Sequence, residues 1–198
     1  MEKFYLEIPT IKRKEEAIKY IEEFQIFNSD INGVGGLDRF LNDYDGWLEK
    51  LEEDYNRIPN EEKVPARTYF LIRKDDNRII GMINIRLALN EKLKKFGGNI
   101  GYSIRPSERG NGYNNINLYL GLLVCDKYNI DKVLLDADLE NPASWKTMEK
   151  LGGKLLREYY DDVYANCVVK DYEIEVKNAI ENNKKELEQY IDFNEFIV

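Results

Sequence analysis

The sequence predicts one mixed α/β domain, because segments with helical periodicity alternate along the chain with segments of strand periodicity. Two strand-like segments, 68–73 and 79–89, flank a polar turn at 74–78 and predict an antiparallel hairpin. Further along, a strand, a helix and another strand follow one another, which predicts a parallel, right-handed crossover. The 198 residues are enough for one domain with a sizeable core.

The first third of the chain is predicted to be helical. Apolar residues recur at helical spacing among charged ones from Thr10 to Phe27, and again from Leu37 to Arg57. A cluster of Asn, Ser, Asp and Gly at 28–36 predicts a loop between the two helices. Asp45 is a candidate N-cap for the main part of the second helix.

The middle of the chain predicts a second group of strands and a helix. A loop at 90–98 leads into a strand at 99–104, and the glycines at 110–112 open an apolar helix. The next strand, 131–138, contains Val133-Leu134-Leu135. This apolar run favours a buried, central position in the sheet.

The last part of the chain predicts a helix, a hairpin and a charged tail. A helix begins at Asn141-Pro142, where proline suits the first turn, and ends at Gly152-Gly153. Segments 154–160 and 163–176 predict a hairpin that turns at Asp161-Asp162. The domain is therefore assigned to residues 1–176, and residues 177–198 are predicted to form an amphipathic helical extension ending in Phe193, Phe196 and Ile197.

Composition excludes several classes of function. The chain has no histidine, which removes Ser-His-Asp and Cys-His catalysis and most zinc sites, so no metal is expected. The net charge of −8 argues against a nucleic-acid partner and is compatible with a cationic substrate. Cys125 and Cys167 are expected to be reduced thiols, and no apolar run is long enough for a membrane span. Acidic residues near the start do not fit a signal peptide, so the expected location is cytoplasmic.

The most informative motif is Arg109-Gly110-Asn111-Gly112, which directly follows a predicted strand and opens a predicted helix. Backbone amides at such a position converge on the helix N-terminus, where the helix dipole favours a phosphate. The P-loop pattern is excluded because Gly-Lys-Ser/Thr is missing, and Asn115 stands where a dinucleotide fingerprint needs its third glycine. The loop therefore predicts a ligand that carries phosphate or pyrophosphate.

The segment Arg105–Tyr113 resembles the pyrophosphate loop of the GNAT acetyltransferases, which has the form Arg/Gln-x-x-Gly-x-Gly/Ala. Here Gly110 and Gly112 occupy the glycine positions, and Ser107 stands where Arg or Gln is usual. A second signature of that family, at 141–153, follows the next strand at the expected place. The resemblance covers about residues 68–172.

The resemblance implies a mostly antiparallel twisted sheet with a central splayed parallel strand pair and flanking helices. It also implies acetyl-CoA as co-substrate, and direct attack on the acetyl group by an amine of a small molecule or peptide. The residues that the resemblance places at the cofactor are Ile104, Arg105, Arg109, Gly110, Asn111, Gly112, Tyr113, Asn114, Asn141, Ser144 and Lys146.

Proton transfer is where the sequence departs from the family. Met148 stands where many relatives have an acidic Tyr, and Asn99 is nearest to the position of the usual basic Glu. Substitutes for the proton chemistry are Tyr160 and Tyr164 on the last hairpin and Asp138 on the preceding strand.

Tyr44, Trp47 and Arg86 are candidate walls of the acceptor pocket. An alternative stays open, in which the chain is a CoA-binding regulatory or interaction module without catalysis. A homodimer also stays open.

Overall fold

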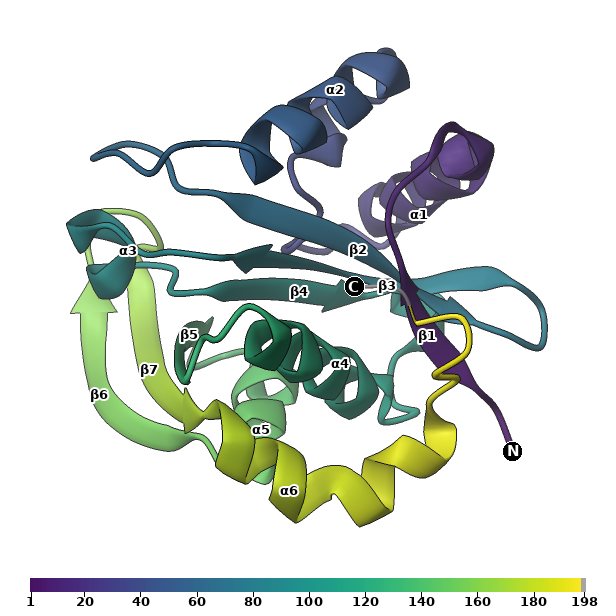
Figure 1. Ribbon diagram of the computed structural model, residues 1–198. Helices are drawn as coiled ribbons and strands as arrows, with labels where there is room; N and C mark the ends of the chain where they lie inside the picture. The colour runs from purple at the N-terminus through teal and green to yellow at the C-terminus, as the bar shows by residue number, and fades with distance from the viewer. Residues whose placement is uncertain (197–198) are drawn as a thin grey trace.

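The computed structural model describes residues 1–196, which form two antiparallel sheets with helices around them (Figure 1). The first sheet has the strand order β1-β2-β3-β4, and the second has the order β5-β7-β6. The strands are Phe4–Glu7 (β1), Ala66–Arg73 (β2), Arg78–Arg86 (β3), Ile100–Ile104 (β4), Lys132–Asp138 (β5), Lys154–Asp161 (β6) and Cys167–Glu175 (β7). The α-helices are Lys14–Ile26 (α1), Tyr44–Tyr55 (α2), Glu91–Lys95 (α3), Tyr113–Lys127 (α4), Pro142–Lys150 (α5) and Val176–Leu187 (α6). Short 3-10 turns lie at Ile11–Arg13, Leu37–Arg39, Pro106–Glu108 and Glu188–Tyr190.

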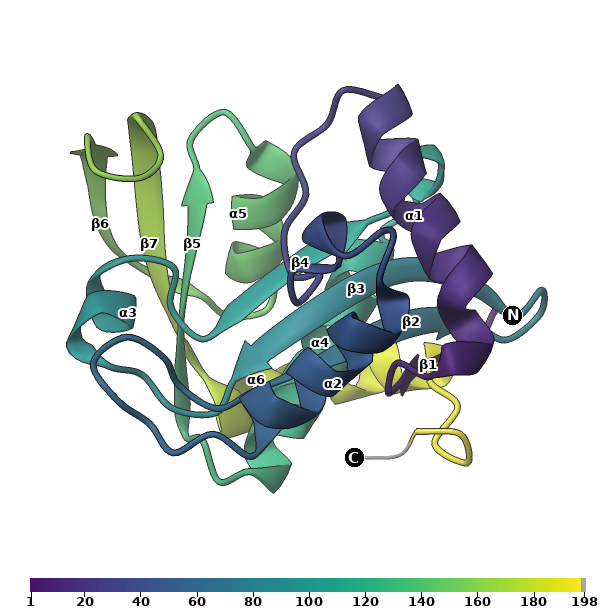
Figure 2. The same ribbon diagram turned by 90° about the horizontal axis from the view of Figure 1, so that it is seen from above.

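The first sheet separates two hydrophobic cores. Helices α1 and α2 cover one face, where Tyr20, Trp47 and Phe70 are fully buried. Helix α4 covers the other face and is itself covered by α6 (Figures 1 and 2). Because α4 is surrounded in this way, it is apolar around most of its circumference, with Leu118 and Leu122 both fully buried.

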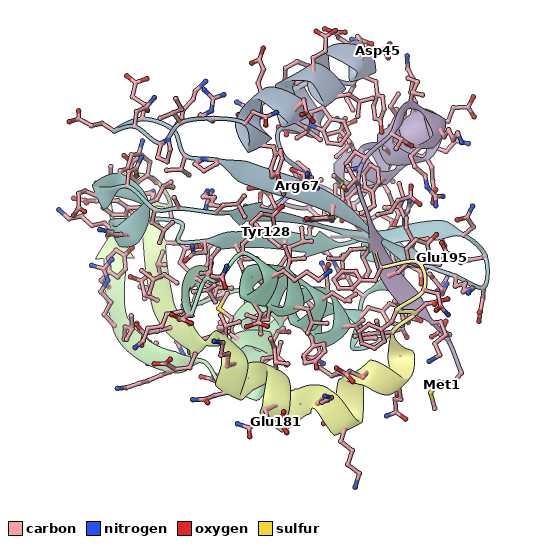
Figure 3. The ribbon with its side chains drawn as sticks, viewed as in Figure 1. Met1, Asp45, Arg67, Tyr128, Glu181 and Glu195 are labelled. Carbon is pink, nitrogen blue, oxygen red and sulfur yellow. The ribbon has the colours of Figure 1, made fainter. Side chains whose placement is uncertain are left out.

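An aromatic cluster covers the part of β2 that β1 does not reach. Strand β1 pairs only with 70–73, which leaves the edge of β2 unpaired at its start. There the guanidinium of Arg67 lies 3.8 Å from the ring centre of Tyr55, and the Tyr128 hydroxyl lies 3.4 Å from the Tyr55 hydroxyl (Figure 3). These side chains join α2 to the end of α4 and shield an edge that could otherwise pair with another chain.

Helix α2 begins later than the sequence pattern predicts. Leu37–Arg39 forms a single 3-10 turn, and α2 itself begins at Tyr44. Asp43 caps the helix, because its carboxylate accepts the N–H of Gly46 at 3.1 Å. The prediction of Asp45 as the cap was wrong. Asp45 lies inside the first turn, where its negative charge interacts favourably with the helix dipole but makes no capping hydrogen bond.

The sequence pattern does not predict two short elements, β1 and α3. Strand β1 has only four residues, too few for a two-residue period to stand out. Helix α3 occupies most of the predicted loop at 90–98, and the Asn90 side chain caps it by accepting the N–H of Leu93 at 2.9 Å.

The final hairpin is present, but its turn is longer than two residues. Strand β6 continues to Asp161, and β7 begins only at Cys167. The Asp161 carboxylate accepts the N–H groups of Val163 and Tyr164 at 2.9 and 3.0 Å. These bonds stabilise a five-residue connection, 162–166, in place of the predicted tight turn. Asn166, at the end of this connection, adopts a positive φ of 52°.

The predicted C-terminal helix ends earlier than the sequence pattern suggests. Helix α6 stops at Leu187, and after one 3-10 turn Ile191 bridges to Phe4 of β1. The N–H of Asp192 then donates to the Phe4 carbonyl at 2.9 Å. The predicted terminal residue Ile197 lies outside the described residues. No helix within residues 1–196 combines the length and apolar character needed to cross a membrane.

Strand β5 lies at the edge of the second sheet, whereas the sequence predicts a central position. It meets the first sheet at one point: the N–H of Asn99 donates to the Leu134 carbonyl at 2.6 Å, and the N–H of Leu134 donates to Asn99 Oδ1 at 2.9 Å. Both sheets are built from antiparallel pairs, and β4 and β5 belong to different sheets. In the apolar run, Val133 and Leu135 are buried in the core beneath α4, whereas Leu134 on the opposite face is half-buried.

Candidate active site

The segment that joins β4 to α4 has an open backbone. Gly110 and Gly112 have φ angles of +84° and +78°, a region that glycine enters without strain. A Cβ at Gly110 would meet no atom within 4 Å, and one at Gly112 would meet only Asn115 Nδ2 at 3.8 Å. The space over this loop is therefore open to a ligand.

Free N–H groups point into this space at the start of α4. The N–H of Asn115 donates to the Gly112 carbonyl at 3.1 Å, whereas the N–H groups from Gly110 to Asn114 have no acceptor within residues 1–196. Helix α4 is 15 residues long, so its dipole adds to these donors. The combination makes an anion-binding site.

Arg105, one of the predicted cofactor residues, is turned away from this site. The residue is 4% exposed, and its guanidinium donates to the Ile79 carbonyl at 2.8 Å and to the Glu23 carboxylate at 3.0 Å. Glu23 also accepts the N–H of Ser107 at 2.7 Å. Burial acts to raise the pKa of Glu23, but the bonds from Ser107 and Arg105 outweigh it and lower the pKa. The Arg105 side chain thus anchors the loop instead of facing a phosphate.

The next acid in the loop is neutralised by arginines. The Glu108 carboxylate is buried and bonds to Arg73 at 2.9 Å and to Arg78. Its backbone carbonyl accepts the side-chain amide of Asn111 at 3.1 Å. These contacts fix the turn before the glycines and keep an uncompensated negative charge away from the anion site.

Arg109 is the exposed cation of the loop. Its Nη2 donates to Ser29 Oγ at 2.9 Å and its Nε to the Ile104 carbonyl at 3.3 Å. The guanidinium carbon lies 5.3 Å from the centre of the Phe24 ring. Since none of these partners is charged, no carboxylate neutralises the positive charge of Arg109, which is available to an anionic ligand.

Two other predicted cofactor residues, Tyr113 and Asn114, use their side chains elsewhere. The buried Tyr113 donates its hydroxyl to the Glu2 carboxylate at 2.8 Å. The Asn114 side-chain amide donates to Thr147 Oγ1 of α5 at 3.2 Å. Each residue therefore offers the loop its backbone N–H only.

One edge of β4 is unpaired beside the loop. The N–H of Arg105 donates to the Ile80 carbonyl at 2.8 Å, so alternate residues of β4 turn their N–H groups towards β3. The N–H groups of Tyr102 and Ile104 point to the opposite side. Within residues 1–196 no strand pairs with that side of β4, which leaves a row of backbone groups free for a ligand rich in amides.

The first turn of α5 faces this edge. Asn141 caps α5 by accepting the N–H of Ser144 at 3.3 Å, and its own side chain is exposed. The Ser144 hydroxyl lies 3.0 Å from the Tyr102 hydroxyl of β4. Lys146 is exposed, with its ammonium 5.4 Å from the centre of the Trp145 ring. Asn141 and Ser144 are thus near the open edge, while Lys146 lies over a neighbour on its own helix.

A family model described as Acetyltransferase (GNAT) domain matches residues 11–154. This chain belongs to the GNAT acetyltransferase family. A search of curated protein sequences found no significant match.

Solved GNAT structures share the fold at low identity. Ribosomal-protein-S5-alanine acetyltransferase from Vibrio fischeri has a TM-score of 0.65 and 13% identity, covering 90% of this chain and 96% of its own. Microcin C7 self immunity acetyltransferase MccE, in complex with acetyl-CoA and AMP, has a TM-score of 0.62 and 17% identity, covering 87% and 92%. Mutant forms of the spermidine/spermine N-acetyltransferase SpeG from Vibrio cholerae have a TM-score of 0.62 and 14% identity, covering 91% and 98%.

In this GNAT domain, the predicted acid–base residues lie on the second sheet and in the connection between β6 and β7. Tyr160 is 59% exposed, and its hydroxyl donates to Asn166 Oδ1 at 2.8 Å within the hairpin. Tyr164 is 57% exposed and packs edge-on against Phe96, with ring centres 5.0 Å apart. Asp138 is exposed at the end of β5. The structure does not bring these three side chains together.

The predicted acceptor-pocket residues of the GNAT domain hold the fold together. Tyr44 and Trp47 are fully buried, and they donate to the carbonyls of Thr10 and Gly35, each at 3.1 Å. Arg86 is half-buried and donates to the carbonyls of Gly97 and Gly98, each at 2.7 Å. Tyr44 and Trp47 present no free polar group to an acceptor, whereas Arg86 makes both of its bonds through Nη1 alone.

Two residues whose roles the sequence pattern does not reveal are Asn99 and Tyr102. Asn99 is buried, and its side chain donates to the Arg86 carbonyl at 3.2 Å while it accepts from Leu134. It joins the two sheets, so it has no free group for a base. Tyr102 lies in an apolar strand, and a hydroxyl in such a setting is the one signal that points to it.

Proposed function

We propose that this chain transfers the acetyl group of acetyl-CoA to an amine, with the pyrophosphate held at the start of α4. The observation that carries the proposal is the run of N–H groups from Gly110 to Asn114, which lack acceptors within residues 1–196 and lie beside an unpaired strand edge. A pyrophosphate suits the first feature, and the amide-rich pantetheine arm suits the second.

The residues present fit acetyl-CoA. The open space over Gly110 and Gly112 admits phosphate oxygens, and Arg109 supplies a cation beside them. The free N–H groups of Tyr102 and Ile104 and the exposed amide of Asn141 would hold the pantetheine arm. Ser144 and Lys146 lie along the same helix, with Ser144 nearer the strand edge.

Acetyl-CoA supplies an activated acyl group, and the protein orients it and moves protons. The acceptor would approach from the face of the second sheet, where loop 90–98 meets the final hairpin. There the carboxylate of Asp136 accepts the N–H of Gly97 at 2.9 Å, and burial is the main cause that raises its pKa. An amine near this carboxylate could pass its proton to water or to Asp136.

The acceptor class is an amine of a small molecule or of a peptide. The net charge of −8 favours a cationic one by long-range attraction. Relatives of the same fold are named for spermidine and for ribosomal protein S5, so spermidine and a peptide with an N-terminal alanine are the first acceptors to test.

The reaction would run in the cytoplasm, without a metal ion and without a nucleic-acid partner. Residues 1–176 would form the catalytic domain and residues 177–198 its C-terminal extension. Sedimentation of the purified chain would decide between a monomer and a homodimer.

A CoA-binding module without catalysis is the second candidate, and one observation favours it. Met148 is buried, and the Asn99 amide is fully engaged, so neither position supplies a proton donor or base.

The test measures CoA binding by calorimetry and the release of CoA thiol from acetyl-CoA with each amine. Binding together with turnover supports the transferase. Binding without turnover above background supports the module, and no binding contradicts both.

A further inference from the structure

Tyr102 reaches from β4 to the first turn of α5. Its hydroxyl lies 3.0 Å from the Ser144 Oγ and 3.2 Å from the Ser144 carbonyl oxygen. The residue is 9% exposed, and its ring belongs to the core beneath the sheet. The contact links the two elements that flank the proposed acetyl-CoA site.

The environment of this phenol keeps its proton in place. Burial raises the pKa of Tyr102 well above its ordinary value, the hydrogen bond with Ser144 opposes the rise, and the charge of Asp136 adds to it. The rise makes this phenol a weaker acid than free tyrosine, so its suitability as a donor rests on its position between β4 and α5 and not on its acidity.

Other candidate donors are less well placed. Met148, at the position where relatives carry a Tyr, has no proton to give. Tyr160 and Tyr164 are 59% and 57% exposed and lie on the final hairpin, away from the first turn of α5 that Tyr102 contacts. Tyr102 is the buried phenol that lies between β4 and α5.

We infer that Tyr102 is the catalytic acid that protonates the sulfur leaving in the acetyl transfer; this inference rests on the proposed function. The amine nitrogen uses its lone pair to form the C–N bond, the C–S bond breaks, and the sulfur keeps that electron pair. Tyr102 gives its phenolic proton to the sulfur. The phenolate then regains a proton from solvent through the Ser144 hydroxyl, and the proton lost by the amine returns to solvent, so charge balances.

The chain offers a closely matched control in Tyr20. Tyr20 is fully buried, and its hydroxyl lies 3.0 Å from Ser103 Oγ and 3.1 Å from the Ser103 carbonyl oxygen. It therefore makes the same two kinds of contact to a serine, but it reaches β4 from α1 on the opposite face of the sheet, whereas Tyr102 reaches from β4 to α5. Tyr20→Phe reports the structural cost of removing a buried phenol oxygen beside β4.

The first experiment needs no acceptor. Wild type, Tyr102→Phe and Tyr20→Phe are saturated with CoA, and the ultraviolet absorbance of the thiolate is titrated with pH. A hydrogen bond to the thiolate should make the pKa of the bound thiol about 1 to 2 higher in Tyr102→Phe than in the other two proteins. An equal thiol pKa in all three overturns the inference.

The second experiment measures transfer with an amine that the wild type accepts. Tyr102→Phe should lower kcat about 100-fold or more, as expected for a lost general acid, while KM for acetyl-CoA stays within about threefold. Tyr20→Phe should keep kcat within about twofold. A loss confined to KM would overturn the assignment, because it would make Tyr102 a binding residue.

A further variant covers the case in which Tyr102→Phe does not fold. Ser144→Ala keeps the phenol but removes the hydroxyl that returns its proton, so kcat should fall about tenfold with the bound-thiol pKa unchanged. Unchanged kcat would then count against the inference. Failure of the wild type to bind CoA contradicts the proposed function itself, whereas normal binding with an unaltered thiol pKa contradicts only the role of Tyr102.

Discussion

The carboxylate of Glu23, in α1, holds the N–H of Ser107 at 2.7 Å at the entrance to the proposed pyrophosphate loop. The same carboxylate pairs with the buried guanidinium of Arg105 at 3.0 Å. A helix more than eighty residues earlier in the chain thus fixes the turn that presents the free N–H groups. The loop depends on this helix for its conformation, although its own sequence carries the motif.

Glu23→Gln should lower the free energy of unfolding by about 1–3 kcal/mol at neutral pH, because the Arg105 guanidinium loses its charged partner in a buried setting. Urea denaturation of the variant and the wild type measures the difference. Glu22→Gln, at an exposed neighbouring position, is the control and should be neutral.

The effect of Glu23 should depend on pH in a defined direction. Because the folded protein lowers the pKa of Glu23, its stabilisation is present above the ordinary glutamate pKa of about 4.3 and is lost as pH falls through the lower, folded value. The difference in the free energy of unfolding between the wild type and Glu23→Gln should therefore disappear at low pH. A difference that stays constant down to low pH would contradict the assigned ion pair.

Gly112→Asp should weaken CoA binding by about tenfold or more, because it places a side chain and a negative charge at the anion site. Gly152→Asp is a matched control: Gly152 also has a positive φ, +88°, and open space around it, but it lies at the far end of α5. Both variants should lose about 1 kcal/mol of stability from backbone strain. Equal CoA affinity in the two variants would place the pyrophosphate elsewhere.

The sequence predicts those features that depend on nearby residues. The positive φ of Gly110 and Gly112, and the helix that follows them, arise from a local pattern and are present in the structure. Side-chain directions, in contrast, depend on contacts with residues that are distant in the sequence. The sequence predicts that Trp47 and Arg105 face ligands, whereas their polar groups bond to Gly35 and Glu23, partners that a local pattern does not reveal.

The placement of β5 shows the same limit. Its apolar run indicates burial, and Val133 and Leu135 are indeed buried on one face of β5, but the run does not tell which strand will pair with it. That choice depends on the Asn99–Leu134 junction and on β7, which pairs along the whole length of β5. Long-range pairing decides sheet order, and no spacing within one strand encodes it.

Asn99→Ala should lower the free energy of unfolding by about 2–4 kcal/mol, since it leaves the Arg86 carbonyl and the Leu134 N–H without their buried partners. Hydrogen exchange should show faster exchange at the Leu134 amide, because the junction between the sheets opens. Asn182→Ala, at an exposed position of α6, is the control and should change neither measurement. Normal protection of Leu134 in Asn99→Ala would mean that the junction does not need this side chain.

The two thiols should react very differently with a disulfide reagent such as dithiobisnitrobenzoate. Cys125 is fully buried, and burial raises its pKa to about 12, so it should not react until the chain unfolds. Cys167 is half-buried, and burial together with the nearby Asp138 raises its pKa as well, so it should react about tenfold more slowly than free cysteine. Absorbance in native buffer and in urea counts the reactive thiols, and Cys167→Ser should leave none in the native state. Rapid reaction of that variant would show that α4 opens readily, which would contradict its enclosure between the first sheet and α6.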